Sequence, residues 1–146
     1  MKNIFWVLSF VLLPIFGFSQ GFGANVGYEY IGKNAGFAGL DYRFSKYSEP
    51  ALNAGAGVYV VSLQKKINIV PEIHLNYNWK NEWFTEVSLS SKNFKPSVGF
   101  NFLNATQLKF GYSFGFNKED SLNGISVGVH FNIGGKHFYD YLRVGF

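Results

Sequence analysis

The chain has 146 residues, a net charge of +4, no cysteine, and aromatic side chains at 20% of its positions. Without cysteine, disulfides cannot hold an exported form of this protein together. The lysines fall mainly in expected turns and do not line one face with interleaved aromatics, so we expect no nucleic-acid partner.

The first segment, residues 1–19, has the pattern of a secretory signal peptide. Lys2 supplies a positive start, residues 4–16 are mostly apolar, and small residues precede the expected cleavage site. The alternative is an N-terminal transmembrane helix, but the apolar run is shorter than the roughly 20 residues that span hydrocarbon. We therefore expect the mature chain to begin at residue 20 and, by its length, to form one domain.

The rest of the chain reads as strands joined by turns. In its most regular part Leu108, Phe110 and Tyr112 alternate with Lys109 and Gly111. Strict alternation over about ten residues predicts a β-strand with two different faces. Eight segments follow this pattern, and they are 21–31, 37–44, 52–60, 67–79, 83–90, 96–103, 106–117 and 125–134.

The two faces of these strands predict their environments. One face is aliphatic or aromatic, while the other carries glycine, serine, asparagine and few charges. A soluble sandwich or a fatty-acid-binding barrel would place many Lys and Glu on its polar face. Glycine suits the cramped interior of an eight-stranded barrel, and an apolar outer face suits lipid. Residues 20–134 are thus predicted to form an eight-stranded antiparallel up-and-down transmembrane β-barrel, whose closure leaves no strand edge exposed to lipid.

Aromatic side chains gather near both sets of turns, as membrane interfaces favour. These aromatics form two belts, one at each end of the strands. With the N-terminus in the periplasm, one belt is periplasmic and the other is extracellular. The periplasmic belt is Tyr42, Phe44, Tyr47, Tyr77, Trp79, Trp83 and Phe102, and the extracellular belt is Tyr28, Tyr30, Phe37, Phe94, Phe114 and Phe116.

Pro71 interrupts the fourth segment, where we expect a bulge or a part of the strand above the membrane.

In this pattern of alternation, residues 21–134 resemble the small bacterial outer-membrane β-barrel family of the OmpA transmembrane domain and OmpX type. The resemblance implies a porin-like architecture integral to the outer membrane of a Gram-negative bacterium. It also implies outer-membrane lipids as partners and insertion by the barrel-assembly machinery.

The C-terminal tail, residues 135–146, ends in a pattern of its own. Phe146, with Val144 and Leu142 at alternate positions, looks like the terminal signature that the assembly machinery reads. Asp140 interrupts the apolar alternation. The tail is therefore either a periplasmic extension, which we favour, or an additional strand.

Five polar residues are predicted to form a belt inside the barrel. Counting register from the turns places them at neighbouring positions on consecutive strands, with Glu86 and Lys109 as an ion pair bridged by Asn101. Buried charges persist only when paired, so this belt would close the lumen. Conduction is the alternative, although eight-stranded barrels are too narrow for an open channel. The belt is Asn76, Glu86, Asn101, Lys109 and Asn132.

Two histidines, His74 and His130, fall on the inward face, with Glu72 and Glu86 near the first. A metal site needs three or more converging ligands, so hydrogen bonding in the lumen is the preferred interpretation. Barrel enzymes such as the lipid A deacylases use a His-x-Ser pair and a nearby Glu on the outer surface, and no His-x-Ser occurs here. We predict no enzyme activity and no cofactor.

Six lysines fall at expected extracellular turns, where their ammonium groups would attract the phosphates of lipopolysaccharide. The predicted role is structural or envelope-stabilising. The alternatives are a surface binding protein or adhesin, whose loops are usually longer, and a transporter that takes small hydrophobic compounds laterally from the membrane. The predicted phosphate contacts are Lys33, Lys65, Lys66, Lys92, Lys95 and Lys118.

Overall fold

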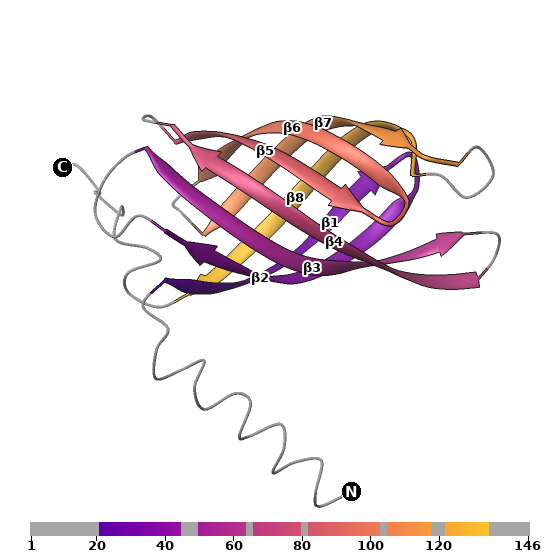
Figure 1. Cartoon of the computed structure of the whole chain (residues 1–146), viewed down its shortest axis with the longest axis horizontal. Helices are drawn as coiled ribbons and strands as arrows, with labels where there is room; N and C mark the ends of the chain where they lie inside the picture. The colour runs from indigo at the N-terminus through magenta and orange to yellow at the C-terminus, as the bar shows by residue number, and fades with distance from the viewer. Residues whose placement is uncertain are drawn as a thin grey trace, which may run out of the picture.

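The computed structural model describes residues 21–44, 50–63, 66–79, 82–102, 105–117 and 122–134, and these form one closed β-barrel (Figure 1). Each strand pairs antiparallel with the next, and β8 pairs with β1. The predicted eight-stranded antiparallel barrel is confirmed. The strands are β1 (Phe22–Ile31), β2 (Asn34–Arg43), β3 (Ala51–Leu63), β4 (Lys66–Asn78), β5 (Trp83–Ser90), β6 (Asn93–Phe102), β7 (Thr106–Gly115) and β8 (Gly124–Gly134).

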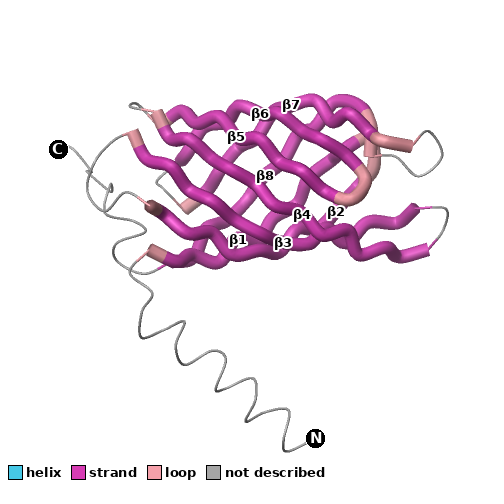
Figure 2. Tube along the Cα trace, viewed as in Figure 1, coloured by secondary structure: helices cyan, strands magenta, loops and turns pink. Residues whose placement is uncertain are grey.

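The two ends of the barrel are distinguished by the connections that they carry. The end that carries the β1–β2, β3–β4, β5–β6 and β7–β8 connections, here called the distal end, is uneven. The β3–β4 hairpin projects well beyond the β5–β6 turn at this end (Figure 2). The opposite end, where β1 begins and β8 ends, is called the proximal end. The signal peptide and the tail predicted for residues 1–19 and 135–146 lie outside the described residues, which contain no helix long and apolar enough to cross a membrane.

The alternation of the sequence becomes two faces of opposite character. Phe110, Val127 and Leu75 point outward and are 53%, 40% and 55% exposed. Glu86 and Lys109 point inward and are each 2% exposed. A soluble globule buries its large apolar side chains and leaves Lys and Glu in water. This barrel has the reverse distribution.

Inward-facing glycines make room for the large side chains that fill the interior. A Cβ atom at Gly57 would lie 2.5 Å from the Phe37 ring, and one at Gly99 would lie 2.2 Å from the Phe84 ring. Real Cβ atoms do not approach other heavy atoms so closely. Glycine at these positions lets a barrel of only eight strands hold aromatic rings in its lumen.

The belt position predicted for Phe37 is wrong, because its side chain points into the barrel and is 4% exposed. It shares the inward face of β2 with Asp41, four residues along the strand, and residues an even number apart lie on one face. Tyr47 lies outside the described residues. The other aromatics of both predicted belts are exposed on the outer face.

Pro71 causes no bulge, contrary to the first expectation. Pairing of β3 with β4 runs without interruption from Ala51↔Asn78 to Leu63↔Lys66. Pairing of β4 with β5 ends at Glu72↔Ser90, one residue before Pro71 is reached. Proline thus stands where β4 becomes an edge strand, a position that tolerates the missing N–H group.

Candidate functional site: the filled lumen

The centre of the lumen holds a buried ion pair that joins strands from opposite sides of the barrel. Lys95 Nζ on β6 donates to Glu29 Oε1 on β1 at 2.5 Å and to Tyr59 Oη on β3 at 2.7 Å. The hydroxyls of Tyr59 and Ser126 donate to the Glu29 carboxylate at 2.6 and 2.5 Å. All four side chains are at most 1% exposed. Every charge in this cluster therefore has a short, charge-assisted partner.

The rim position predicted for Lys95 is wrong. The β5–β6 turn consists of Ser91 and Lys92 alone, and β6 begins at Asn93 instead of after Lys95. Lys95 then shares the inward face with Asn93, and its side chain is completely buried. Burial of an unpaired ammonium group is costly, and the nearby Glu29 carboxylate removes that cost.

His74 lies between two carboxylates. Its Nε2 atom is 2.5 Å from Asp41 Oδ1, while its Nδ1 atom is 3.5 Å from Glu72 Oε1. Asn25 Nδ2 donates to the other Asp41 oxygen at 3.0 Å. The histidine faces inward as predicted and is 4% exposed. In this arrangement the ring links β4 to β2 through its hydrogen bond with Asp41.

His130 also faces inward and is completely buried. Its Nδ1 atom is 2.8 Å from Asn25 Oδ1, and its Nε2 atom is 3.5 Å from Glu29 Oε2. The Phe37 ring packs against the imidazole with centroids 5.0 Å apart. Among the described residues no three His, Cys, Asp or Glu side chains come together in a way that could hold a metal ion.

The predicted ion pair between Glu86 and Lys109 is present near the proximal half of the lumen. Lys109 Nζ donates to both Glu86 oxygens, at 2.9 and 2.8 Å, and Asn76 Nδ2 donates to Oε2 at 3.3 Å. Asn76 pairs directly with Glu86 in register, as predicted. Lys109 pairs with Gly99 on β6, which has no side chain to block the path to β5.

The other register predictions for this belt are wrong. Asn101 does not bridge the ion pair, because Glu86 pairs with Ser97 and Asn101 pairs with Gln107. Lys109 pairs with Gly128, which is four residues from the predicted Asn132. Because the β5–β6 turn is shorter than predicted, the register of β6 against β5 differs from the predicted one. Asn101 therefore lies closer to the proximal end than predicted.

Asn101 instead belongs to an amide cluster at the proximal end. Its Nδ2 atom donates to Asn78 Oδ1 at 2.8 Å, and Gln107 Nε2 donates to Asn101 Oδ1 at 3.0 Å. Asn132 faces the lumen from β8, where it pairs with Asn25. The five predicted belt residues are therefore all inward, but they divide among separate clusters.

At the distal end the lumen is filled by polar and then apolar side chains. Asn93 accepts a hydrogen bond from Ser90 and donates to Ser113 Oγ at 2.6 Å, and Ser113 donates to the Leu122 carbonyl. Buried apolar side chains surround this end of the lumen. They are Ile31, Ala35, Phe37, Tyr59, Val61, Leu63, Val70 and Leu122.

Several lumen residues were not singled out as site residues from the sequence, namely Glu29, Tyr59, Asp41 and Asn25. Their position on the polar face of the alternation was the available signal. That signal shows only that each of these side chains points into the lumen. Which side chains come into contact depends on the register across three or more strands, and the alternation does not determine register.

Three of the lysines predicted to contact lipid phosphates lie at the distal end. Lys66 is exposed at the start of β4, and Lys33 and Lys92 are partly exposed in the β1–β2 and β5–β6 turns. Lys65 and Lys118 lie outside the described residues. The distal end therefore presents positive charge from three separate hairpins.

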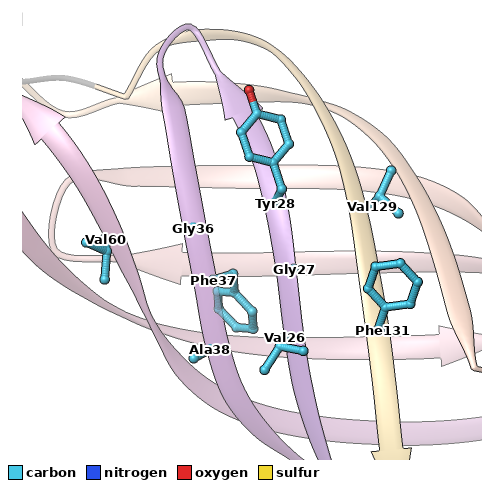
Figure 3. Close-up of a pocket in the computed structure, with 9 residues that line it drawn as sticks. All are labelled: Val26, Gly27, Tyr28, Gly36, Phe37, Ala38, Val60, Val129 and Phe131. Atoms are coloured by element: carbon cyan, nitrogen blue, oxygen red, sulfur yellow. The ribbon is translucent and has the colours of Figure 1, made fainter.

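An apolar hollow of about 510 Å³ lies on the outer wall over β1, β2, β3 and β8 (Figure 3). Gly36 and Ala38 leave space between the larger Tyr28, Val60 and Phe131. A Cβ atom at Gly36 would meet nothing within 4 Å. The hollow has the apolar lining that an alkyl chain requires.

No family model, no curated protein and no solved structure matches this chain.

Proposed function

We propose that this chain is an integral outer-membrane β-barrel of a Gram-negative bacterium, exported by the signal peptide expected at residues 1–19. The observation that carries the proposal is the reversed distribution of side chains. Large apolar residues cover the outside between two rings of aromatics, while Lys, Glu, Asp and His are paired inside. A bilayer is the solvent in which this distribution is favourable. Closure of the barrel pairs the strand edges that lipid could not satisfy, except along the distal part of β4 beyond its pairing with β5.

The filled lumen supports a structural, envelope-stabilising role. Ion pairs, amide clusters and the distal apolar side chains occupy the interior from one end to the other. An eight-stranded barrel is barely wide enough for its own side chains. We infer that the barrel contributes rigidity and lipid contacts and conducts no ions.

Gel migration of the unheated protein, a bilayer conductance recording and the detergent sensitivity of a deletion strain test this proposal. The unheated membrane fraction is expected to migrate as a compact band that shifts on boiling, because a hydrogen-bonded barrel resists detergent until heated. Reconstituted protein is expected to give no single-channel conductance, and a deletion strain is expected to become sensitive to detergent. A protein recovered entirely from the soluble fraction would contradict the membrane assignment, and discrete channels would contradict the closed lumen.

We further propose that the distal lysines Lys33, Lys66 and Lys92, with Lys65 and Lys118, contact lipopolysaccharide phosphates. Lys95 does not belong to this set, because its side chain is buried in the lumen. Ammonium groups on several hairpins at the same end of the barrel would replace part of the divalent cations that bridge those phosphates. The same lysines would help to anchor the barrel at the outer leaflet.

Charge reversal at Lys33 and Lys66 tests the lipid contact. The Lys33→Glu/Lys66→Glu variant is expected to make cells more sensitive to removal of divalent cations by a chelator, because repulsion replaces attraction at the phosphates. The matched Lys33→Arg/Lys66→Arg variant keeps the charge and is expected to behave as wild type. Equal chelator sensitivity of the two variants, at equal amounts in the membrane, would argue against phosphate binding.

The competing functions receive less support. The β1–β2 and β5–β6 turns are two residues each, Gly32–Lys33 and Ser91–Lys92, and adhesins present longer loops. Within the described part of the chain catalysis has no support, because His74 and His130 are buried in the lumen. Lateral transport would need a continuous path from lipid through the interior, which the packed ion pairs occupy.

A further inference from the structure

The hollow over β1, β2, β3 and β8 follows β2, because this strand supplies the smallest outward side chains there. Outward residues of the four strands lie in rows, since they pair in register. One row is Val60, Gly36, Tyr28 and Val129, and the next row toward the proximal end is Val58, Ala38, Val26 and Phe131. In both rows the residue from β2 is the smallest. The hollow is therefore one strand wide, with walls from β1 and β3.

The two ends of the hollow differ in polarity. At the proximal end Leu40 of β2 points outward between Ala24 and Ala56, so the strand is bulky where its neighbours are small. At the distal end Tyr28 Oη donates to Asn34 Oδ1 at 2.7 Å. Figure 3 shows the Tyr28 hydroxyl directed toward the β1–β2 turn. The hollow thus has an apolar body, an apolar proximal end and a polar distal end.

The polar distal end carries hydrogen-bond donors and a positive charge. Because Asn34 Oδ1 accepts from Tyr28, the Nδ2 group of this exposed amide presents its N–H donors on the other side. Lys33, which is partly exposed, lies in the β1–β2 turn three residues from Gly36, about 10 Å along the strand. Ammonium and amide N–H groups are the donors that bind phosphate oxygens.

The width of the hollow limits what it can hold. Neighbouring strands are about 4.8 Å apart, so walls on β1 and β3 are separated by about 10 Å. This width admits one alkyl chain, or one side chain from a second copy of the barrel. Two copies that share a two-fold axis along the membrane normal would bring their Lys33 residues to the same height beside that axis, where like charges repel. A lipid phosphate at the same place would be attracted.

We propose that the hollow binds one acyl chain of lipid A, the phosphorylated anchor of lipopolysaccharide, while Lys33 and Asn34 bind one of its phosphates. The hollow lies along the distal half of β2, beside the leaflet that holds lipopolysaccharide. The bilayer is itself apolar, so the chain gains packing contacts in the hollow and no transfer from water. Simultaneous contact with head group and chain distinguishes this lipid from its neighbours. This inference rests on the proposed membrane placement and on the proposed contact between lysines and phosphates.

The test compares lipids that differ in phosphate and in head group. Folded protein in detergent micelles is mixed with lipid A, with dephosphorylated lipid A or with phosphatidylglycerol, and retained lipid is measured by native mass spectrometry. The wild type is expected to retain lipid A about fivefold more strongly than the dephosphorylated form. It is expected to retain phosphatidylglycerol less, because a phosphate monoester carries more charge at neutral pH than a diester. Inorganic phosphate is expected to compete poorly, since it lacks the acyl chain.

Matched variants separate the hollow from general effects on the outer wall. Ala38→Leu fills the hollow and is expected to reduce retention of lipid A by a factor of about three or more. Ala54→Leu makes the same change on the outer face of β3 near the proximal end and is expected to leave retention unchanged. Lys33→Gln is expected to abolish the preference for the phosphorylated lipid, while Lys33→Arg keeps it.

A second filling variant covers the case in which Ala38→Leu does not fold. A Cβ atom at Gly36 would meet nothing within 4 Å, so Gly36→Val adds a side chain without a clash. Valine is also favoured over glycine in a strand. Gly36→Val is expected to reduce retention of lipid A in the same way as Ala38→Leu.

Four outcomes would overturn the inference: equal retention of lipid A and its dephosphorylated form by the wild type, phosphatidylglycerol retained as strongly as lipid A, full retention by both Ala38→Leu and Gly36→Val, or inorganic phosphate that competes as well as the lipid. A lipid-free dimer that Ala38→Leu abolishes would also overturn it and would assign the hollow to a second copy.

Failure of the hollow and failure of the proposed function give different results. Heat-modifiable migration is measured for the wild type and for each variant in parallel. If the wild type migrates as a folded membrane barrel and Lys33→Glu/Lys66→Glu raises chelator sensitivity, while the filling variants retain lipid A fully, the hollow alone is refuted. A wild-type protein that stays out of the membrane refutes the proposed function.

Discussion

Replacement of Lys95 with alanine is expected to lower the free energy of unfolding of the barrel by about 3–5 kcal/mol. The ammonium group is completely buried and lies 2.5 Å from Glu29 and 2.7 Å from the Tyr59 hydroxyl. Its removal leaves the Glu29 carboxylate in the lumen without its lysine partner, with the hydroxyls of Tyr59 and Ser126 and the more distant His130 Nε2, at 3.5 Å, as its remaining contacts. The lost contacts join β6 to β1 and β3 across the barrel, so the substitution weakens the interactions that hold these strands together.

Urea unfolding in lipid vesicles, followed by tryptophan fluorescence, measures this effect. Lys66→Ala removes an exposed lysine and is expected to change stability by less than about 0.5 kcal/mol. The double variant Glu29→Gln/Lys95→Met removes both charges and is expected to recover part of the loss, because no unpaired ion remains. If Lys95→Ala were no more damaging than Lys66→Ala, the central ion pair would not stabilise the barrel.

The direction of most side chains was predictable from the sequence because a strand has a period of two. Alternation alone placed Glu86, Lys109, His74 and His130 inside and Phe110 outside, and the structure agrees. It also gave eight strands, since turn residues separate the alternating segments. These properties depend on local pattern, which a single sequence contains.

Register and the exact turns were not predictable in this way. A turn rich in Ser, Lys and Asn does not show where pairing resumes, so the two-residue β5–β6 turn was assigned five residues. That error placed Lys95 at the rim and Asn101 beside Glu86. The lysine–glutamate pair was still found, because the Lys109 side chain is long enough to cross β6 beside Gly99.

Replacement of Phe110 with arginine tests the feature on which the membrane assignment depends, and it is expected to destabilise the barrel in lipid vesicles by about 2–4 kcal/mol. Phe110 lies at the middle of β7, points outward, and pairs with Val98 and Val127. At that depth a guanidinium group would lose its hydration to hydrocarbon.

Ile69→Arg is the matched control for Phe110→Arg, because Ile69 also points outward and is 70% exposed, but lies on the part of β4 beyond its pairing with β5. There the arginine would reach the interface, and a cost of at most about 1 kcal/mol is expected. On a water-soluble barrel both positions would be ordinary surface sites, and both variants would change stability by less than about 0.5 kcal/mol. The difference in urea stability between Phe110→Arg and Ile69→Arg therefore distinguishes a lipid-facing wall from a water-facing one, because only lipid makes the cost of a charge depend on its depth.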